Sequence, residues 1–257
     1  MARINCAGYK PDGTRCKIKW GLNDQGYCFH HDWQARPVCQ GFSVDNQTRC
    51  KNHAKTGYAY CCASHDPAIG LIRSHELDPI TPGLRVRVQA DVVARYGGTD
   101  VYNREWLDLE TPFALHLDHI VEKQCFPFMF SQMGLRQGDE DLAMATEVLR
   151  ENVVHELDNL ALTRSNTNRI KGSAVWHFLD DSLTGHRSKT FTDYLSAARR
   201  DNESLGRDAT RQITRCMGRS MKMCQRKLGD EGETPVLEQL SEHLQQMYVD
   251  MELHGAR

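Results

Sequence analysis

The sequence lacks any long hydrophobic run. None of its apolar stretches approaches the roughly 20 residues that a membrane-spanning helix needs. The opening MARINCAGYKPDG also lacks the hydrophobic core of a signal peptide. These absences exclude the membrane-protein class from our expectations, and we expect an intracellular, cytoplasmic protein with no membrane partner.

A strong charge of either sign is also missing, because 32 Lys and Arg stand against 34 Asp and Glu, for a net charge of −2. This balance excludes a uniformly basic binder of nucleic acid. Any contact with nucleic acid must therefore come from local clusters. The length of 257 residues permits one large domain or two smaller ones.

Cysteine is abundant and unevenly distributed, with seven of the ten lying before residue 63. Without a signal peptide, these cysteines fit reduced metal ligands better than disulfides. The segment is an internal duplication, because Thr-Arg-Cys-Lys surrounds both Cys16 and Cys50, and Cys-x-Gly-aromatic opens both copies. The spacing C-x11-C-x2-H also recurs, which defines the ligand sets Cys6, Cys16, Cys28 and His31, and Cys39, Cys50, Cys62 and His65.

Three thiolates and one imidazole match a closed tetrahedral zinc site. Zinc binding would supply folding free energy that about 30 residues cannot obtain from a core. We therefore predict two structural Zn2+ ions in residues 1–66. Three other residues could act as ligands. Cys61 could replace Cys62, His30 could replace His31, and His53 forms its own C-x2-H with Cys50. The equal spacing favours Cys62 and His31.

Residues 1–66 carry nine Lys or Arg against five Asp or Glu. This local excess favours contact with DNA phosphates, with Arg15 and Arg49 as candidates, or docking on another part of the chain or on another protein. The proline- and glycine-rich residues 67–84 then predict a linker. After it, residues 85–95 form a short strand or a helix that ends at Gly97.

Two later segments carry candidate chemistry. ALHLDHIV alternates apolar and polar residues as a strand does, and Asp118 and His119 stand near its end. In LDNLALTRSNTNRIKGSAVWHFL, Asn159 precedes a short apolar run. The later apolar periodicity predicts a helix from about residue 167, with Ser165 or Asn166 near its N-cap. Asn168 and Lys171, three residues apart, then share one helix face.

These two segments, within residues 114–180, resemble the HNH nuclease family, and DNLALTRSNTNRIKGS looks like the corresponding part of the HNH domain in RNA-guided CRISPR nucleases. The resemblance implies a ββα-metal fold that cleaves DNA and leaves 5′-phosphate and 3′-hydroxyl ends. It also implies the following roles: Asp118 and Asn168 as ligands of a catalytic Mg2+ or Mn2+, His119 as general base, Asn159 as a brace between strands, and Lys171 as a phosphate contact.

The interval from His119 to Asn159 departs from the family, because Asn159 lies 40 positions after His119, which is more than is usual. We expect an inserted helix around residues 140–151. On a strand, alternate residues share a face, so His116 is a reserve ligand or phosphate contact beside Asp118. Because adjacent residues face opposite ways, the strand should end or distort for Asp118 and His119 to meet at one site.

The last segment, residues 205–257, predicts a basic helix followed by an acidic one, with Gly229 at the turn of a hairpin. Four arginines recur every four residues in the basic helix, namely Arg207, Arg211, Arg215 and Arg219. Such like charges destabilise an isolated helix, so an anionic partner should lie against them. DNA phosphate and the acidic helix at residues 230–252 are the two candidates.

The sequence thus predicts an α+β fold, with zinc modules at 1–66, a linker at 67–84, an HNH domain at 85–204 and a helical region at 205–257. We expect a metal-dependent endonuclease acting on double-stranded DNA, site-specific in the homing or restriction manner and encoded by a bacterium or phage. A double-strand break would need a homodimer or two sequential events. The alternatives are a non-catalytic zinc DNA-binding or adaptor protein with a decayed HNH motif, and a nuclease acting on RNA or branched DNA.

Overall fold

A computed structural model describes residues 5–42, 48–111, 114–232 and 234–253. The chain divides into two compact units, Met1–Ile69 and Gly70–Arg257. The border falls within the predicted linker, but much of that linker belongs to the second unit. Ile72 and Leu77 are buried in its core, the latter at the end of the short 3-10 helix η3 (Ser74–Leu77).

The first unit has little regular structure. Its described residues form two 3-10 helices, η1 (Asp32–Ala35) and η2 (Ala63–His65), and several isolated bridges. Cysteine side chains make up the centre of its first half, and only a few apolar residues such as Ile18 and Leu22 pack against them. So small an apolar core cannot by itself stabilise a fold of this length, which agrees with the prediction that metal binding contributes.

The second unit combines helices with a small sheet, as the α+β prediction requires. Strand β1 (Leu115–His119) pairs antiparallel with β2 (Leu160–Arg164), and His119 lies opposite Leu160. Its described α-helices are α1 (Leu84–Tyr96), α2 (Cys125–Gln132), α3 (Glu140–Val148), α4 (Ser165–Leu183), α5 (Phe191–Ala197), α6 (Arg207–Asp230) and α7 (Pro235–Leu253).

Several element predictions are confirmed. Helix α1 resolves the choice between strand and helix, and it ends at Gly97, which adopts the left-handed φ of 60° that glycine tolerates. The insertion contains α3, which continues into a π-helical turn at Leu149–Val153. Helix α4 begins at Ser165, immediately after β2, with Arg164 at its N-cap in place of the predicted Ser165 or Asn166, and it packs against both strands.

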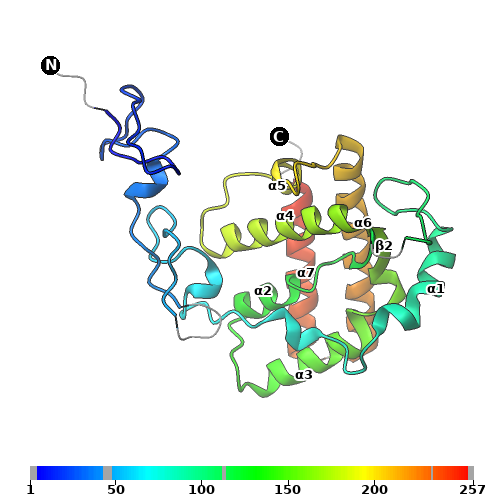
Figure 1. The fold of residues 1–257 in the computed structure, drawn as a ribbon. Helices are drawn as coiled ribbons and strands as arrows, with labels where there is room; N and C mark the ends of the chain where they lie inside the picture. Colours follow the sequence, from blue (N-terminus) through cyan, green and yellow to red (C-terminus); the bar gives the residue numbers. More distant parts are fainter. Residues whose placement is uncertain (1–4, 43–47, 112–113, 233, 254–257) are drawn as a thin grey trace. The chain divides into compact units, whose positions relative to one another are not determined.

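Helices α6 and α7 lie side by side in the second unit, where Figure 1 draws them in orange and red. Gly218 on α6 permits their close approach, because a Cβ atom there would lie 2.5 Å from the Tyr248 ring of α7. The prediction that Gly229 forms the turn is wrong, since Gly229 lies inside α6, which continues to Asp230. Both helices contribute to the same core as α2 and α4, so residues 205–253 are part of this unit.

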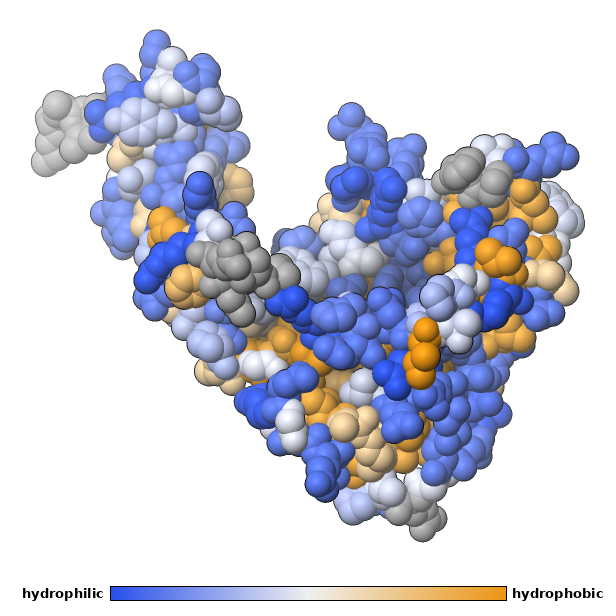
Figure 2. Space-filling view, turned by 60° about the horizontal axis from the view of Figure 1, so that its bottom comes forward, coloured by the Kyte–Doolittle hydropathy of each residue, from blue (hydrophilic) through white to orange (hydrophobic). Residues whose placement is uncertain are grey.

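Among the described residues, no helix combines the length and apolar character needed to cross a membrane. On the face shown in Figure 2, hydrophilic side chains cover most of the larger unit, and apolar side chains gather in separate patches between them.

Candidate functional site

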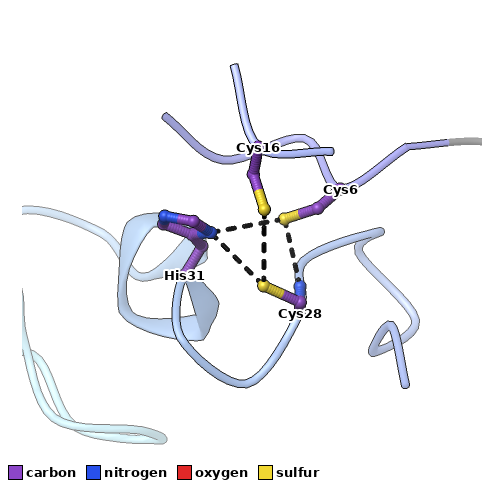
Figure 3. Close-up of side chains that lie close together, drawn as sticks. All are labelled: Cys6, Cys16, Cys28 and His31. Atoms are coloured by element: carbon purple, nitrogen blue, oxygen red, sulfur yellow. Dashed lines mark hydrogen bonds between the residues drawn. The ribbon is translucent and has the colours of Figure 1, made fainter. Parts of the chain in front are cut away.

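The first half of the small unit brings together the four side chains predicted as its zinc ligands. Cys6, Cys16, Cys28 and His31 are all buried, and their ligand atoms lie within 4.8 Å of one another. Figure 3 shows the three sulfur atoms and the imidazole converging on one point, with Cys28 and His31 on one segment of chain. His30 is exposed and does not join the group.

The spacing of these atoms fits a tetrahedral zinc ion. With Zn–S of about 2.3 Å and Zn–N of about 2.0 Å, tetrahedral geometry places two sulfurs roughly 3.8 Å apart and a sulfur and a nitrogen roughly 3.5 Å apart. The Sγ atoms of Cys16 and Cys28 are 3.9 Å apart, and Nδ1 of His31 lies 3.3 Å from Sγ of Cys28. This donor set would hold zinc through three sulfurs and His31 Nδ1.

Backbone amides stabilise the thiolate form of Cys6 in the first cluster. Burial alone would raise the pKa of Cys6, but the N–H groups of Cys28 and Gly8 donate to its sulfur at 3.2 and 3.3 Å. Together with its side-chain neighbours they lower that pKa from 9.0 to about 6. The thiolate is the form that binds zinc, so these hydrogen bonds favour the metal-binding state.

The second cluster consists of Cys39, Cys50, Cys61 and His65. Cys61 therefore takes the place that equal spacing predicted for Cys62, and the prediction of Cys62 is corrected. The Cys61 amide donates to Sγ of Cys39 at 3.3 Å, just as the Cys28 amide donates to Sγ of Cys6. The Sγ atom of Cys62 contacts the Ser64 hydroxyl instead, at 3.1 Å. Compared with the first module, the second therefore has one residue fewer between its second and third cysteine ligands. It has one residue more between the third cysteine ligand and the histidine.

Steric contact explains why each Cys-x-Gly motif carries a glycine. A Cβ atom at Gly8 would lie 2.4 Å from Cβ of His31, and one at Gly41 would lie 2.5 Å from Cβ of His65. The ligand histidine therefore packs directly against the backbone of the first cysteine's loop in both modules. His53, the third open position, contacts the Arg36 carbonyl oxygen through Nδ1 at 2.9 Å and is not in the cluster.

The larger unit places Asp118 and Lys171 in contact. Asp118 lies on β1 with 1% of its surface exposed, and Nζ of Lys171 on α4 lies 2.9 and 2.8 Å from its two carboxylate oxygens. Nζ also donates to the carbonyl oxygens of His119 and Ile120 at 2.7 and 3.2 Å, and Glu122 lies 3.2 Å away. The Lys171 ammonium is thus surrounded by five oxygen atoms.

The phosphate-binding role predicted for Lys171 needs correction. Its side chain is fully buried, and the oxygen atoms around it compensate the charge of its ammonium group. The Tyr102 hydroxyl, also buried, donates to the remaining side of Asp118. Lys171 therefore holds the end of β1 in place, and it is not available to contact phosphate in this arrangement.

His119 stands where β1 ends, as predicted, and its imidazole contacts a second histidine. Nε2 of His119 lies 3.0 Å from Nδ1 of His155, and Nε2 of His155 lies 2.8 Å from the Leu77 carbonyl oxygen. A carbonyl oxygen only accepts, so His155 carries its proton on Nε2 and accepts at Nδ1. His119 then donates from Nε2 and keeps the lone pair on Nδ1.

The charge state of both histidines agrees with this pattern. Burial, assisted by His155 and nearby lysines, holds the pKa of His119 well below its usual value. Burial also lowers the pKa of His155. His119 is therefore neutral near pH 7, which is the form that accepts a proton.

The Asn159 side chain forms hydrogen bonds with several parts of the second unit. Its side-chain oxygen accepts from the Val121 amide at 2.8 Å, and its side-chain nitrogen donates to the carbonyl oxygens of Val121 and Val154. The Ser220 hydroxyl of α6 donates to the same side-chain oxygen at 2.7 Å. These hydrogen bonds join the segment after β1 to the start of β2 and to α6.

Asn168 lies in the first turn of α4, where its Nδ2 is 3.3 Å from Nδ1 of His116. Its predicted partner Asp118 is instead held by Lys171 and Tyr102. Oxygen donors such as these suit Mg2+, but the ammonium of Lys171 already supplies the positive charge beside Asp118. Among the described residues, only the two cysteine-histidine clusters gather three or more Cys, His, Asp or Glu ligands. The site as arranged does not fit a divalent ion at Asp118.

The basic stripe of α6 is exposed, and the acidic helix does not neutralise it. Arg207, Arg211, Arg215 and Arg219 are all exposed. Among the described residues, no ion pair joins α6 to α7: Arg211 pairs with Asp208 of its own helix at 3.8 Å, and Asp250 of α7 pairs with Arg187. The two helices pack through their apolar faces, so the internal partner considered for the stripe is not observed.

Four residues of these sites were not identified from the sequence: Tyr102, Glu122, His155 and the buried Asp100. None stands at a motif position, and each reaches the site from a loop or from the insertion. Only the fold brings them together. Comparison with protein-family models, with curated proteins and with solved structures finds no match to this chain.

Proposed function

We propose that this protein is a DNA endonuclease of the HNH type, in which the β1–β2–α4 unit hydrolyses phosphodiester bonds. One observation carries the proposal. Strand β1 pairs antiparallel with β2, and β2 leads directly into α4, with Asp118 and His119 at the end of β1 and Asn168 in the first turn of α4. This is the order and placement that the sequence resemblance implies. The expected products have 5′-phosphate and 3′-hydroxyl ends.

The residues around His119 support a proton-transfer role. Neutral His119 offers the lone pair of Nδ1, which is the group that takes a proton from an attacking water in hydrolysis. Lys171 donates to the carbonyl oxygen of His119, and Asn159 accepts from the amide of Val121, two residues later. An ion bound by Asp118 and Asn168, Mg2+ or Mn2+ in the proposal, requires that the Lys171 ammonium leave Asp118. We therefore assign only proton transfer and positioning to the arrangement described.

The proposal includes site-specific cleavage of double-stranded DNA, in the manner of homing or restriction enzymes. Its support is the presence of two further cation-rich surfaces. Arg15 and Arg49 are exposed on the zinc modules, and among the described residues the α6 stripe forms no ion pair with the acidic helix α7. Phosphate contacts of this kind position DNA, and they add affinity to a catalytic unit.

A second candidate is a zinc-dependent DNA-binding or adaptor protein without catalysis. The ion pair between Lys171 and Asp118 favours it, because that pair occupies the carboxylate which a catalytic ion would need. In this case the β1–β2–α4 unit would serve as a scaffold, and the zinc modules and α6 would carry the function.

Cleavage of a mixed DNA library separates the two candidates. Zinc-loaded protein is incubated with supercoiled plasmids that carry a bacterial and phage genomic library, with Mg2+ or Mn2+, and cut sites are mapped by sequencing. The endonuclease predicts recurrent cuts that His119→Ala abolishes while leaving DNA binding intact. Binding without any cut by the wild-type protein contradicts the endonuclease and supports the adaptor. Parallel RNA and branched-DNA substrates test the remaining alternative.

A further inference from the structure

The exposed arginines of α6 line a hollow rather than a flat surface. A hollow of about 710 Å³ lies between the start of α6, the loop after α1 and the start of α4. Five arginines line it, and the acids on its walls are Glu203 and Asp208; the arginines are Arg104, Arg164, Arg207, Arg211 and Arg215. The excess of cations gives this hollow a local positive charge in a chain that is acidic overall.

The hollow continues along α6 as a groove. Arg104 and Arg215 also line the next depression, which adds Arg219 and Lys222. A third depression shares these last two residues and extends to Arg226. Arg226 lies 19 positions after Arg207, and at about 1.5 Å per residue this corresponds to roughly 28 Å along the helix. We refer to this surface as the α6 groove.

Asp100 binds the backbone amides of the two arginines that α6 does not supply, one through its carboxylate and the other through its carbonyl oxygen. Asp100 is fully buried, and its oxygens accept from the Tyr102 amide, the Thr163 hydroxyl and the Arg164 amide at 2.7 to 3.1 Å. The Asp100 carbonyl oxygen accepts from the Arg104 amide at 2.8 Å. Asp100 thereby ties both arginine-bearing segments together.

Arg104 is held in a backbone conformation that L-residues rarely adopt, with φ of 62°. Such strain persists only where the surrounding structure enforces it, and it is concentrated at functional sites. Here it fixes Arg104 at the border of two of the depressions. The adjacent Tyr102 donates to Asp118, so the same loop serves both the groove and the end of β1.

We infer that the α6 groove, completed by Arg104 and Arg164, binds the sugar-phosphate backbone of duplex DNA. That the ligand is DNA rests on the proposed endonuclease function, whereas that the ligand is a polyanion rests on the charge of the groove itself. Its cations lack acidic partners on α7 among the described residues, and its length approaches one turn of B-DNA, about 34 Å. The groove also includes Asn166 and Thr167, so it reaches the turn of α4 that carries Asn168.

Binding without cleavage tests the inference. Zinc-loaded protein is titrated with a 5′-labelled duplex of about 30 base pairs, without Mg2+, Mn2+ or chelator, over a range of salt concentrations. The variant Arg211→Gln/Arg215→Gln should bind about 10- to 100-fold more weakly, and the slope of log affinity against log salt should fall by about 2, since each phosphate contact contributes about 0.9. The control Arg87→Gln/Lys189→Gln removes two exposed charges outside the groove and should retain the wild-type slope.

Equal affinity and equal slope in the two double variants would overturn the inference. An RNA duplex of the same length that competes as strongly as DNA would overturn the assignment to DNA. Groove-dependent binding with no cleavage after Mg2+ or Mn2+ is added would support the groove while contradicting the proposed endonuclease, so the two failures are distinguishable.

Discussion

Nε2 of His119 lies 3.0 Å from Nδ1 of His155, and this contact determines which nitrogen of His119 is free. His155 belongs to the insertion between the two strands, and its other nitrogen donates to the Leu77 carbonyl oxygen. The insertion and the η3 segment together therefore orient the histidine that the proposed reaction uses as base. His155 acts on the reaction only through His119, so it is a positioning residue.

The variant His155→Ala should reduce DNA cleavage by about tenfold or more, because an incorrectly oriented base loses part of the factor of about 100 or more that a general base contributes. His155→Asn should restore most of the rate, since the amide oxygen of asparagine can accept the same proton. Cleavage rates at saturating Mg2+ measure both effects.

The matched control for this prediction is His177→Ala, which removes an exposed histidine of α4. It should cleave at the wild-type rate. If His155→Ala and His177→Ala were equally active, or if His155→Asn were as impaired as His155→Ala, the positioning role would be wrong.

Lys171 should contribute strongly to stability. Lys171→Met leaves the buried carboxylates of Asp118 and Glu122 without their cation, and breaking one partner of a buried ion pair costs about 3–5 kcal/mol. Urea unfolding should show this loss of unfolding free energy, whereas Arg169→Met on the exposed side of α4 should change it little. Adding Asp118→Asn and Glu122→Gln to Lys171→Met should recover part of the loss. A Lys171→Met variant as stable as Arg169→Met would contradict the buried ion-pair account.

The ligand set of the second cluster can be tested one cysteine at a time. Cys61→Ser should leave one tightly bound zinc per chain, because Cys61 lies with Cys39, Cys50 and His65. Cys62→Ser should keep two. Metal analysis after competition with a chromogenic chelator measures the count. Loss of zinc from Cys62→Ser but not from Cys61→Ser would return the assignment to the one that the sequence spacing predicted.

Glu122 should make stability depend on pH. Burial raises its pKa in the folded protein from 4.5 to about 7, although Lys171 opposes the rise. The folded state then retains a proton that the unfolded state releases, so stability is lost as pH rises from about 4.5 through 7. The melting temperature of the wild type should fall across this interval relative to that of Glu122→Gln. If the melting temperatures of both proteins changed equally between pH 5 and 7.5, Glu122 would not be the titrating group.

Much of the fold follows from local sequence patterns. The duplicated cysteine spacing predicted two clusters, apolar alternation predicted β1, and apolar periodicity predicted α4. The inserted helix was expected from the length of the segment between His119 and Asn159. The identity of one ligand could not be predicted from the sequence. Cys61 and Cys62 are adjacent, and a change of one residue in the length of a loop is enough to place either of them in the cluster. The fold distinguishes them, because the Cys61 amide donates to Sγ of Cys39 and the Cys61 sulfur lies in the cluster, whereas the Cys62 sulfur contacts Ser64.

The burial of Lys171 could not be predicted for a different reason. Its position on a helix was predicted, but its environment depends on Tyr102 and Glu122, which come from a loop and from the turn after β1. A motif position specifies a residue type, whereas the surrounding charges arise from tertiary packing. The same reason applies to His155, which no local pattern connects to His119.

The central claim is that this chain hydrolyses DNA through the β1–β2–α4 unit, and the most direct test is single-nucleotide mapping of the ends that it produces. Zinc-loaded wild-type protein with Mg2+ should yield 5′-phosphate and 3′-hydroxyl ends at recurrent positions in duplex DNA, and His119→Ala should yield none. Uncut DNA with the wild type, or identical cleavage by His119→Ala, would contradict the account.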